Sequence, residues 1–287
     1  MLKNKVIAFL GAGSMAEAMI AGIVNGGKVP SDQIIVSNKS NQTRLSELQM
    51  GYNIQGVQKD LVPYKEIDIF VLAMKPKDAE IALSSLKTHI NPNQLILSVL
   101  AGISTSFMEG HLHPTQQVIR VMPNTSSMIG ESATALSPGA HTTEENISIA
   151  KELLECIGEV FIIPEEKMDI FTGIAGSGPA YFYYLMEHME KAGTDAGLDS
   201  ETTRQIIAQT IVGAAKMVQE QEETPSELRE NVTSPNGTTA AGLEALKQHG
   251  GGKAISQAIH HAANRSKEIC SQLEKKNSTA NQSKKAM

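Results

Sequence analysis

The sequence predicts an α/β fold in which strands and helices alternate up to residue 164 and helices alone follow. Three observations lead to this prediction. Val6 to Leu10 form a continuous apolar run, typical of a strand covered on both faces, and the run ends at a glycine-rich turn that opens a helix. Strand-like and helix-like segments then alternate as far as Pro164. Beyond Pro164 the apolar residues recur only at helical spacing.

The alternating elements predict a Rossmann-type, doubly wound parallel sheet. After a first helix, we expect strands at residues 33–37, 68–73, 94–99 and 117–122, with helices starting near residues 42, 77 and 104 between them. Residues 132–136 and 159–163, with a helix over residues 143–156 between them, extend the edge of the sheet. The expected organisation is a dinucleotide-binding domain over residues 1–164.

The second part, residues 165–274, is expected to be an all-helical dimerisation and substrate domain. Gly178-Pro179 and the capping box Thr224-Pro225-Ser226-Glu227 mark two helix starts. Within residues 206–218 and 255–269 the apolar side chains recur every three or four positions, as on one face of a helix. These apolar faces are larger than one copy of the chain can bury, which predicts a homodimer. Residues 275–287 are polar and are expected to form a disordered tail.

Charge and composition favour a small-molecule ligand. The 25 basic and 31 acidic residues give a net charge of -6, which argues against nucleic-acid and anionic-membrane partners. Two distant cysteines, Cys156 and Cys270, suggest neither a disulfide framework nor a zinc site, and the histidine pairs lack further ligands at metal-binding spacing. We expect no metal, no membrane-spanning segment and a cytoplasmic location.

The glycine-rich turn has the pattern G-x-G-x-x-A, formed by Gly11, Gly13 and Ala16. The glycines allow a tight turn and a close ligand approach, and the small third residue lets the helix pack on the strand. Free N–H groups at the helix N-terminus then face a diphosphate. This predicts dinucleotide binding, although glycines also occur in ordinary strand-to-helix turns.

The residues after the second expected strand decide between the two nicotinamide cofactors. Ser37-Asn38-Lys39-Ser40 offer hydroxyl, amide and ammonium groups, and Arg44 follows, whereas Asp32 stands at the wrong end of the strand. These groups suit the extra phosphate of NADP better than the free ribose of NAD. The alternative is an ordinary polar turn with a helix cap.

Three further turns carry candidate residues. Ala73-Met74-Lys75-Pro76 and Leu100-Ala101-Gly102 leave two strands at the edge where such folds bind ligands. Lys75 is equally well explained as a solvated lysine before a helix. Ser234-Pro235-Asn236-Gly237 is a turn, and Thr238 and Thr239 open the next helix, a good receptor for a carboxylate, although a cap alone would need one hydroxyl.

Five motifs together give a more specific indication. G-A-G-S-M-A-E-A-M, A-M-K-P, R-V-M-P-N-T, A-G-S-G-P-A-Y and S-P-N-G-T-T-A-A-G-L occur in this order over nearly the whole chain. The sequence thereby resembles the pyrroline-5-carboxylate reductases. The resemblance implies reduction of 1-pyrroline-5-carboxylate to L-proline, the last step of proline biosynthesis, by an oxidoreductase acting on a C–N bond with NADPH, and in some members NADH. It also implies homodimers, often assembled into decamers.

The resemblance further implies a set of site residues. The positions that match cofactor contacts are Gly11, Ala12, Gly13, Ser14, Met15, Ser37, Asn38, Lys39, Ser40, Ala73, Met74, Lys75, Pro76, Ala101, Gly102 and Asn231. Those that match substrate contacts are Glu222, Gly237, Thr238 and Thr239, with Thr239 at the threonine that hydrogen-bonds the ring nitrogen. Hydride transfer needs positioning more than a dedicated acid or base.

Several positions depart from the family pattern. Asn236 stands where a second glycine is usual, and Ser126 stands where M-P-N-T-P has proline. Asparagine tolerates left-handed backbone geometry, so we expect the turn to survive. An asparagine that contacts adenosine is not evident near Asp60.

Two alternatives stay open at this point. A β-hydroxyacid dehydrogenase shares the two-domain plan, but Phe182 occupies the position of its catalytic lysine. A non-catalytic NADP-binding regulator would keep the fold without turnover.

Overall fold

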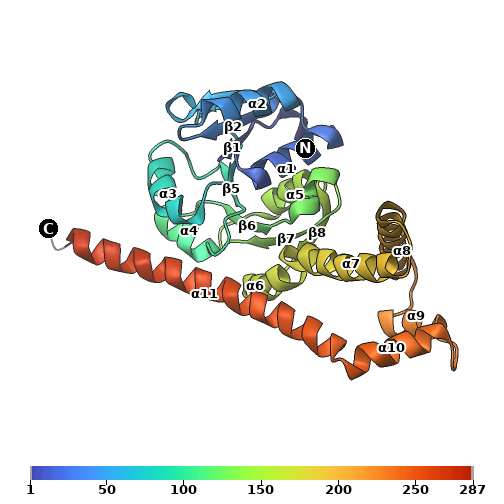
Figure 1. Cartoon of the computed structure of the whole chain (residues 1–287). Coiled ribbons are helices and arrows are strands. Elements are labelled where there is room, and N and C mark those ends of the chain that lie inside the picture. The colour runs from blue at the N-terminus through green and yellow to red at the C-terminus, as the bar shows by residue number, and fades with distance from the viewer. Residues whose placement is uncertain (1, 286–287) are drawn as a thin grey trace. The chain divides into compact units, whose positions relative to one another are not determined.

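The computed structural model describes residues 2–285, with side chains described for residues 2–272. It divides the chain into two compact units (Figure 1). The first unit combines the chain up to Gly176 with the chain from His261 onward, and the second is Ser177–His260.

The first unit is built on one sheet. Within the described residues it has eight strands: β1 (Ile7–Leu10), β2 (Ile34–Asn38), β3 (Gln55–Gln58), β4 (Ile69–Leu72), β5 (Leu95–Ser98), β6 (Val118–Met122), β7 (Ser132–Pro138) and β8 (Gly158–Ile162). Their order is β3-β2-β1-β4-β5-β6-β7-β8, and every neighbouring pair is parallel except β6 and β7. The order steps outward in both directions from β1, so the predicted doubly wound Rossmann-type sheet is confirmed.

Two strands differ from the sequence prediction. β3 was not among the expected strands, because Gln55–Gln58 is a half-exposed edge segment without an apolar run. β7 runs antiparallel to β6, whereas a wholly parallel sheet was expected. Only a short link with one 3-10 turn, Thr125–Ile129, joins these two strands. A parallel return needs a crossover of about a dozen residues or more, so the chain turns back antiparallel.

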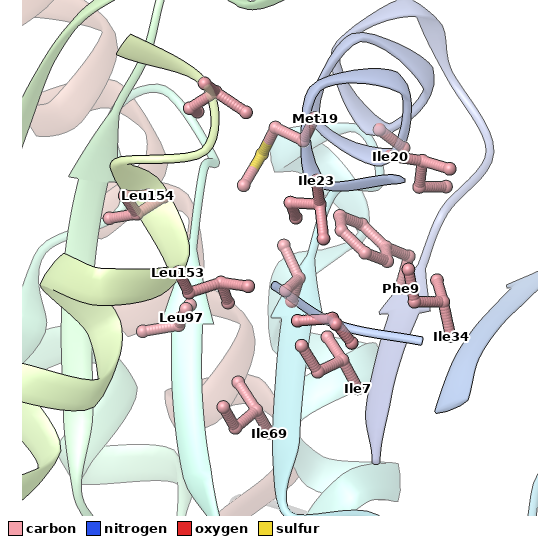
Figure 2. Packing of buried hydrophobic residues seen from close by; sticks show 14 of the residues in the cluster. Ile7, Phe9, Met19, Ile20, Ile23, Ile34, Ile69, Leu97, Leu153 and Leu154 are labelled. Atoms are coloured by element: carbon pink, nitrogen blue, oxygen red, sulfur yellow. The ribbon is translucent and has the colours of Figure 1, made fainter. Parts of the chain in front are cut away.

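Helices cover both faces of the sheet. On one face lie α1 (Ser14–Gly26), α2 (Gln42–Tyr52) and α5 (Glu144–Leu154), and on the other lie α3 (Ala79–Lys87) and α4 (Thr105–His111). Figure 2 shows Met19, Ile20 and Ile23 of α1 near Phe9 of β1, and Leu153 and Leu154 of α5 belong to the same buried cluster. These side chains are fully buried. The apolar run of β1 is therefore covered on both faces, as its composition predicts.

Short helical turns complete this unit: Leu2–Asn4, Ser31–Gln33, Lys59–Leu61, Pro76–Asp78, Thr125–Ile129, Glu165–Lys167, α6 (Met168–Phe171) and a π-helical turn at Thr172–Gly176. Met168 is buried against Met122 and Ala135, and the Ser266 hydroxyl donates to Asp169 at 2.7 Å. The segments that precede and follow Ser177–His260 in the sequence therefore contact each other within the first unit, which runs to Gly176 and resumes at His261.

The second unit contains α7 (Gly178–Asp195), α8 (Ser200–Glu220), α9 (Pro225–Asn231), α10 (Thr238–Gln248) and the start of α11 (Gly251–Lys285). The predicted proline in the first turn of α7 and the predicted capping box at Thr224 are both present. Helix α11 is continuous to Lys285, and the side chains of the expected tail lie outside the described residues, as do residues 286–287 altogether.

The helical unit buries little of its own surface. Within Ser177–His260 only Gly178, Thr203 and Ile207 are buried. The exposed apolar side chains include Phe182, Tyr183, Tyr184, Leu185, Met189, Ile206, Val212, Met217 and Val218. One copy therefore leaves the periodic apolar faces of α7 and α8 uncovered, which is the condition for packing against a second chain.

Candidate active site

The residues predicted to bind the cofactor within the first unit lie at one edge of the sheet. Ala12 and Gly13 follow β1, Lys39 and Ser40 follow β2, Lys75 follows β4, and Ala101 follows β5. These four strands are parallel neighbours in register, with Leu10 beside Ser37 and Leu72, and Leu72 beside Ser98. Their carboxyl ends therefore meet, at the edge where open α/β sheets bind ligands.

Gly11 joins three of the predicted segments. Its N–H donates to the carbonyl of Ser37 at 2.8 Å, and its φ is +125°. A Cβ on Gly11 would lie 2.3 Å from the carbonyl oxygen of Ala73, so no other residue fits without a backbone shift. The first glycine of the motif thus holds β1 and β4 close together.

Gly13 has a different role. It is the N-cap of α1 with an ordinary φ of -78°, it is exposed, and a Cβ there would have no atom within 4 Å. Ala16 is fully buried, as the third small position requires. The space above Gly13 and the first N–H groups of α1 are therefore open toward the sheet edge, where the sequence predicts a diphosphate.

The loop after β2 is arranged by its own asparagines. The Asn38 Oδ1 accepts from the backbone N–H groups of Ser40 and Asn41 at 3.0 and 2.9 Å. The Asn38 Nδ2 donates to the Asn41 carbonyl at 2.8 Å, and Asn41 caps α2. The side chains of Lys39 and Ser40 remain exposed. The loop is thus both a capped polar turn and a surface that presents a cation at the predicted phosphate position.

Arg44 ties this loop to the glycine turn. Its Nε donates to the Ala12 carbonyl at 3.1 Å, its Nη2 pairs with Glu17, and its Nη1 donates to Glu47 at 3.3 Å. The hydrogen bond to Glu17 is the largest cause that raises the pKa of Arg44. The Tyr52 hydroxyl also donates to Glu17, at 3.3 Å, and burial, more than this carboxylate, raises the pKa of Tyr52.

The segment after the β5 turn is linked through Glu165 to a buried cation, Arg120. Gly102 is buried with a φ of +75°. Thr105, the first residue of α4, donates its N–H to Glu165 at 2.9 Å, and its hydroxyl donates to the same carboxylate. Glu165 also pairs with Arg120 at 3.3 Å. Arg120 is 3% exposed, and its Nε and Nη2 have no hydrogen-bond partner in the described part of the chain. Sequence reasoning did not single out Arg120, although a charge inside an apolar strand was a signal.

Asn124 was also missed as an individual residue. It is buried at the end of β6, its Oδ1 accepts from the Ser126 N–H at 3.0 Å, and its Nδ2 donates to the Ala175 carbonyl in the π-helical turn at 3.2 Å. The N–H at position 126 would be absent in a proline. Ser126, the departure from the family pattern, therefore adds a hydrogen bond within the R-V-M-P-N-T motif.

In the second unit the structure confirms the expected turn. Asn236 adopts a φ of +60°, and the Gly237 N–H donates to the Ser234 carbonyl at 3.0 Å. Gly237 is the N-cap of α10, so neither threonine that follows is needed as a cap. Thr238 and Thr239 are exposed, and neither hydroxyl has a hydrogen bond to another described residue. Glu222 precedes α9 and Asn231 ends it, and both are exposed.

Comparison with known proteins identifies the family. A family model described as pyrroline-5-carboxylate reductase dimerisation matches residues 165–269, and one described as NADP oxidoreductase, coenzyme F420-dependent, matches residues 6–102. The chain is 62% identical to pyrroline-5-carboxylate reductase 1 of Bacillus spizizenii, over 95% of this chain and 92% of that protein. The chain belongs to the pyrroline-5-carboxylate reductase family.

Other reductases extend the match. Pyrroline-5-carboxylate reductase 2 of Bacillus subtilis is 43% identical over 94% of this chain and 96% of its own length. The crystal structure of the Plasmodium falciparum reductase with NADP bound superposes with a TM-score of 0.85 at 26% identity, covering 94% of this chain and all (100%) of that one. The reductase family therefore accounts for both units of the chain.

The described residues hold no group of three or more histidine, cysteine, aspartate or glutamate side chains that could bind a metal ion. Among the described residues, no helix combines the length and the apolar character that a membrane span requires.

Proposed function

We propose that this protein reduces 1-pyrroline-5-carboxylate to L-proline with NADPH, the last step of proline biosynthesis. The observation that carries the proposal is the 62% identity to a pyrroline-5-carboxylate reductase over 95% of the chain. The relatives at this level of similarity carry that activity in their names, and one solved reductase contains NADP. The sheet unit would bind the cofactor, and the helical unit would dimerise and hold the substrate.

The residues at the sheet edge fit the cofactor. Gly13 leaves room for a diphosphate at the N-terminus of α1, where no side chain occupies the cap. Ser37 to Ser40 would receive the extra phosphate of NADPH, since the loop presents Lys39 and has no carboxylate. Ala73 to Pro76, Ala101 and Gly102 would border the nicotinamide, and Asn231 matches a further cofactor contact of the family. When bound, NADPH supplies the hydride.

The turn before α10 would bind the substrate. The free N–H groups at the start of α10, the hydroxyls of Thr238 and Thr239 and the backbone of Gly237 would form a receptor for the substrate carboxylate. Glu222, which precedes α9, matches a further substrate contact of the family. The Thr239 hydroxyl would hydrogen-bond the ring nitrogen. Because a protonated imine is already electrophilic, the protein contributes mainly by orienting the ring toward the hydride donor.

Thr239→Ala tests this assignment. We expect kcat and kcat/KM to fall about 10-fold or more, which corresponds to about 1.4 kcal/mol of lost transition-state interaction. Thermal stability should hardly change, because Gly237 and not Thr239 caps α10. Thr202→Ala, another exposed threonine in the first turn of a helix, is the control. Normal turnover in Thr239→Ala would overturn the catalytic role.

Two finer features belong to the same proposal. Assembly of dimers into decamers is supported by the resemblance to the family, and sedimentation mass tests it. A cytoplasmic location is supported by the free thiol of Cys156, which suits a reducing compartment, and cell fractionation tests it.

A further inference from the structure

We propose that Glu17 is a specificity-determining residue that weakens the preference of this enzyme for NADPH over NADH by neutralising Arg44 beside the cofactor edge. The inference rests on the proposed cofactor edge and concerns a residue that none of the motifs assigns to the cofactor. Glu17 lies in the first turn of α1, just behind the glycine turn.

The guanidinium of Arg44 is fixed by three partners. Its three nitrogens bind the Ala12 carbonyl, Glu17 and Glu47, and its side chain is 24% exposed. Glu17 is held in turn by the hydroxyl of Tyr52 and is 27% exposed. Because each nitrogen of the guanidinium has a partner, the Arg44 side chain is held in one conformation beside the glycine turn.

Arg44 also belongs to the loop that would select the cofactor. Its backbone N–H donates to the Asn41 Oδ1 at 3.0 Å, and Asn41 lies in the turn that Asn38 arranges. The cation therefore stands between the loop after β1 and the loop after β2, which are adjacent at the sheet edge. A phosphate on the adenine ribose would approach from this side, where Lys39 is the exposed cation.

The two carboxylates on Arg44 cancel the attraction that it would exert on that phosphate. Replacing the Glu17 carboxylate with an amide removes one negative charge and keeps one oxygen, which can accept from Arg44. The Tyr52 hydroxyl meets the other oxygen of Glu17 and can instead accept from the amide nitrogen of the variant. Removing a unit charge near a phosphate at a partly exposed site changes binding by about 3- to 10-fold. The diphosphate is common to both cofactors, so the change in discrimination comes from the extra phosphate alone.

The test compares Glu17→Gln with wild type by calorimetric titration with NADP⁺ and with NAD⁺. We expect the ratio of the NAD⁺ to the NADP⁺ dissociation constant to rise about 3- to 10-fold, and the gain to shrink in high salt. Glu47→Gln, whose carboxylate is 55% exposed, should shift the ratio in the same direction by less. Glu66→Gln, an exposed carboxylate away from this edge, is the control and should leave the ratio unchanged.

An unchanged or lower ratio in a Glu17→Gln variant that unfolds at the wild-type temperature would overturn the inference. Equal tightening of both cofactors would overturn it too, because the carboxylate would then act on the diphosphate. These results differ from failure of the proposed function, in which the wild-type protein itself would bind no NADP⁺ and would not reduce 1-pyrroline-5-carboxylate.

Discussion

Gly11 and Gly13 belong to one motif, and the structure predicts that alanine impairs folding stability at Gly11 and cofactor binding at Gly13. At Gly11 the φ of +125° is strained for any residue with a Cβ, and this alone costs about 1–3 kcal/mol. The methyl would also lie 2.3 Å from the Ala73 carbonyl oxygen and 2.7 Å from the Met74 nitrogen, both backbone atoms, and the forced shift adds about 1–3 kcal/mol. Gly11→Ala should therefore lose about 2–6 kcal/mol of folding free energy.

At Gly13 the φ of -78° suits alanine and a Cβ would have no atom within 4 Å, so the loss of the glycine cap costs about 1 kcal/mol or less. The methyl would stand instead where the diphosphate approaches, and we expect the dissociation constant of NADP⁺ to rise about 10-fold or more.

Calorimetric unfolding and NADP⁺ titration of both variants separate the two effects. In a chain of this size about 1 kcal/mol corresponds to about 2–4 °C, so Gly11→Ala should lower the Tm by about 4–24 °C and Gly13→Ala by a few degrees at most. A wild-type Tm in Gly11→Ala would refute the argument from the close approach of β1 and β4. Wild-type affinity for NADP⁺ in Gly13→Ala would refute the assignment of the diphosphate to the N-terminus of α1.

Three further predictions concern the buried cation, the cofactor loop and the dimer. Glu165→Gln leaves the buried Arg120 without a carboxylate and should lower the free energy of unfolding by about 1–3 kcal/mol, a range set below that of a fully buried ion pair because Glu165 is 26% exposed. Glu166 is exposed, so the control variant Glu166→Gln should unfold at the wild-type temperature. Equal Tm values for the two variants would contradict this prediction. Asn38→Asp places a negative charge at the predicted phosphate position and should narrow or reverse the preference for NADPH over NADH, so an unchanged ratio of the two KM values would count against that loop. The exposed apolar faces of α7 and α8 predict a dimer or larger assembly at micromolar concentration, and sedimentation as a folded monomer would exclude it.

Sequence reasoning succeeded where a residue pattern has one physical explanation. The apolar run before Gly11, followed by a glycine turn, is the covered strand that was predicted, and the capping box at Thr224 begins a helix. The tolerance of Asn236 for a left-handed turn was also predicted correctly, at a φ of +60°.

Sequence reasoning was less complete where a side chain contacts a residue that is distant in the sequence. Glu165 meets Thr105 and Arg120 across 60 and 45 residues of sequence, a contact that no local periodicity encodes. The direction of β7 depends on the length of the preceding link, and the edge strand β3 has too few apolar residues to be distinguished from a loop. The same holds for Asn124, whose amide reaches Ala175 only once the fold brings the two together.

The most direct test of the account is a steady-state activity assay with the purified protein. On addition of 1-pyrroline-5-carboxylate we expect steady oxidation of NADPH, followed at its near-ultraviolet absorbance, with one L-proline formed for each NADPH consumed. We expect this rate to fall about 10-fold or more in Thr239→Ala. A protein that is folded and binds NADP⁺ but oxidises no NADPH with this substrate would contradict the central claim.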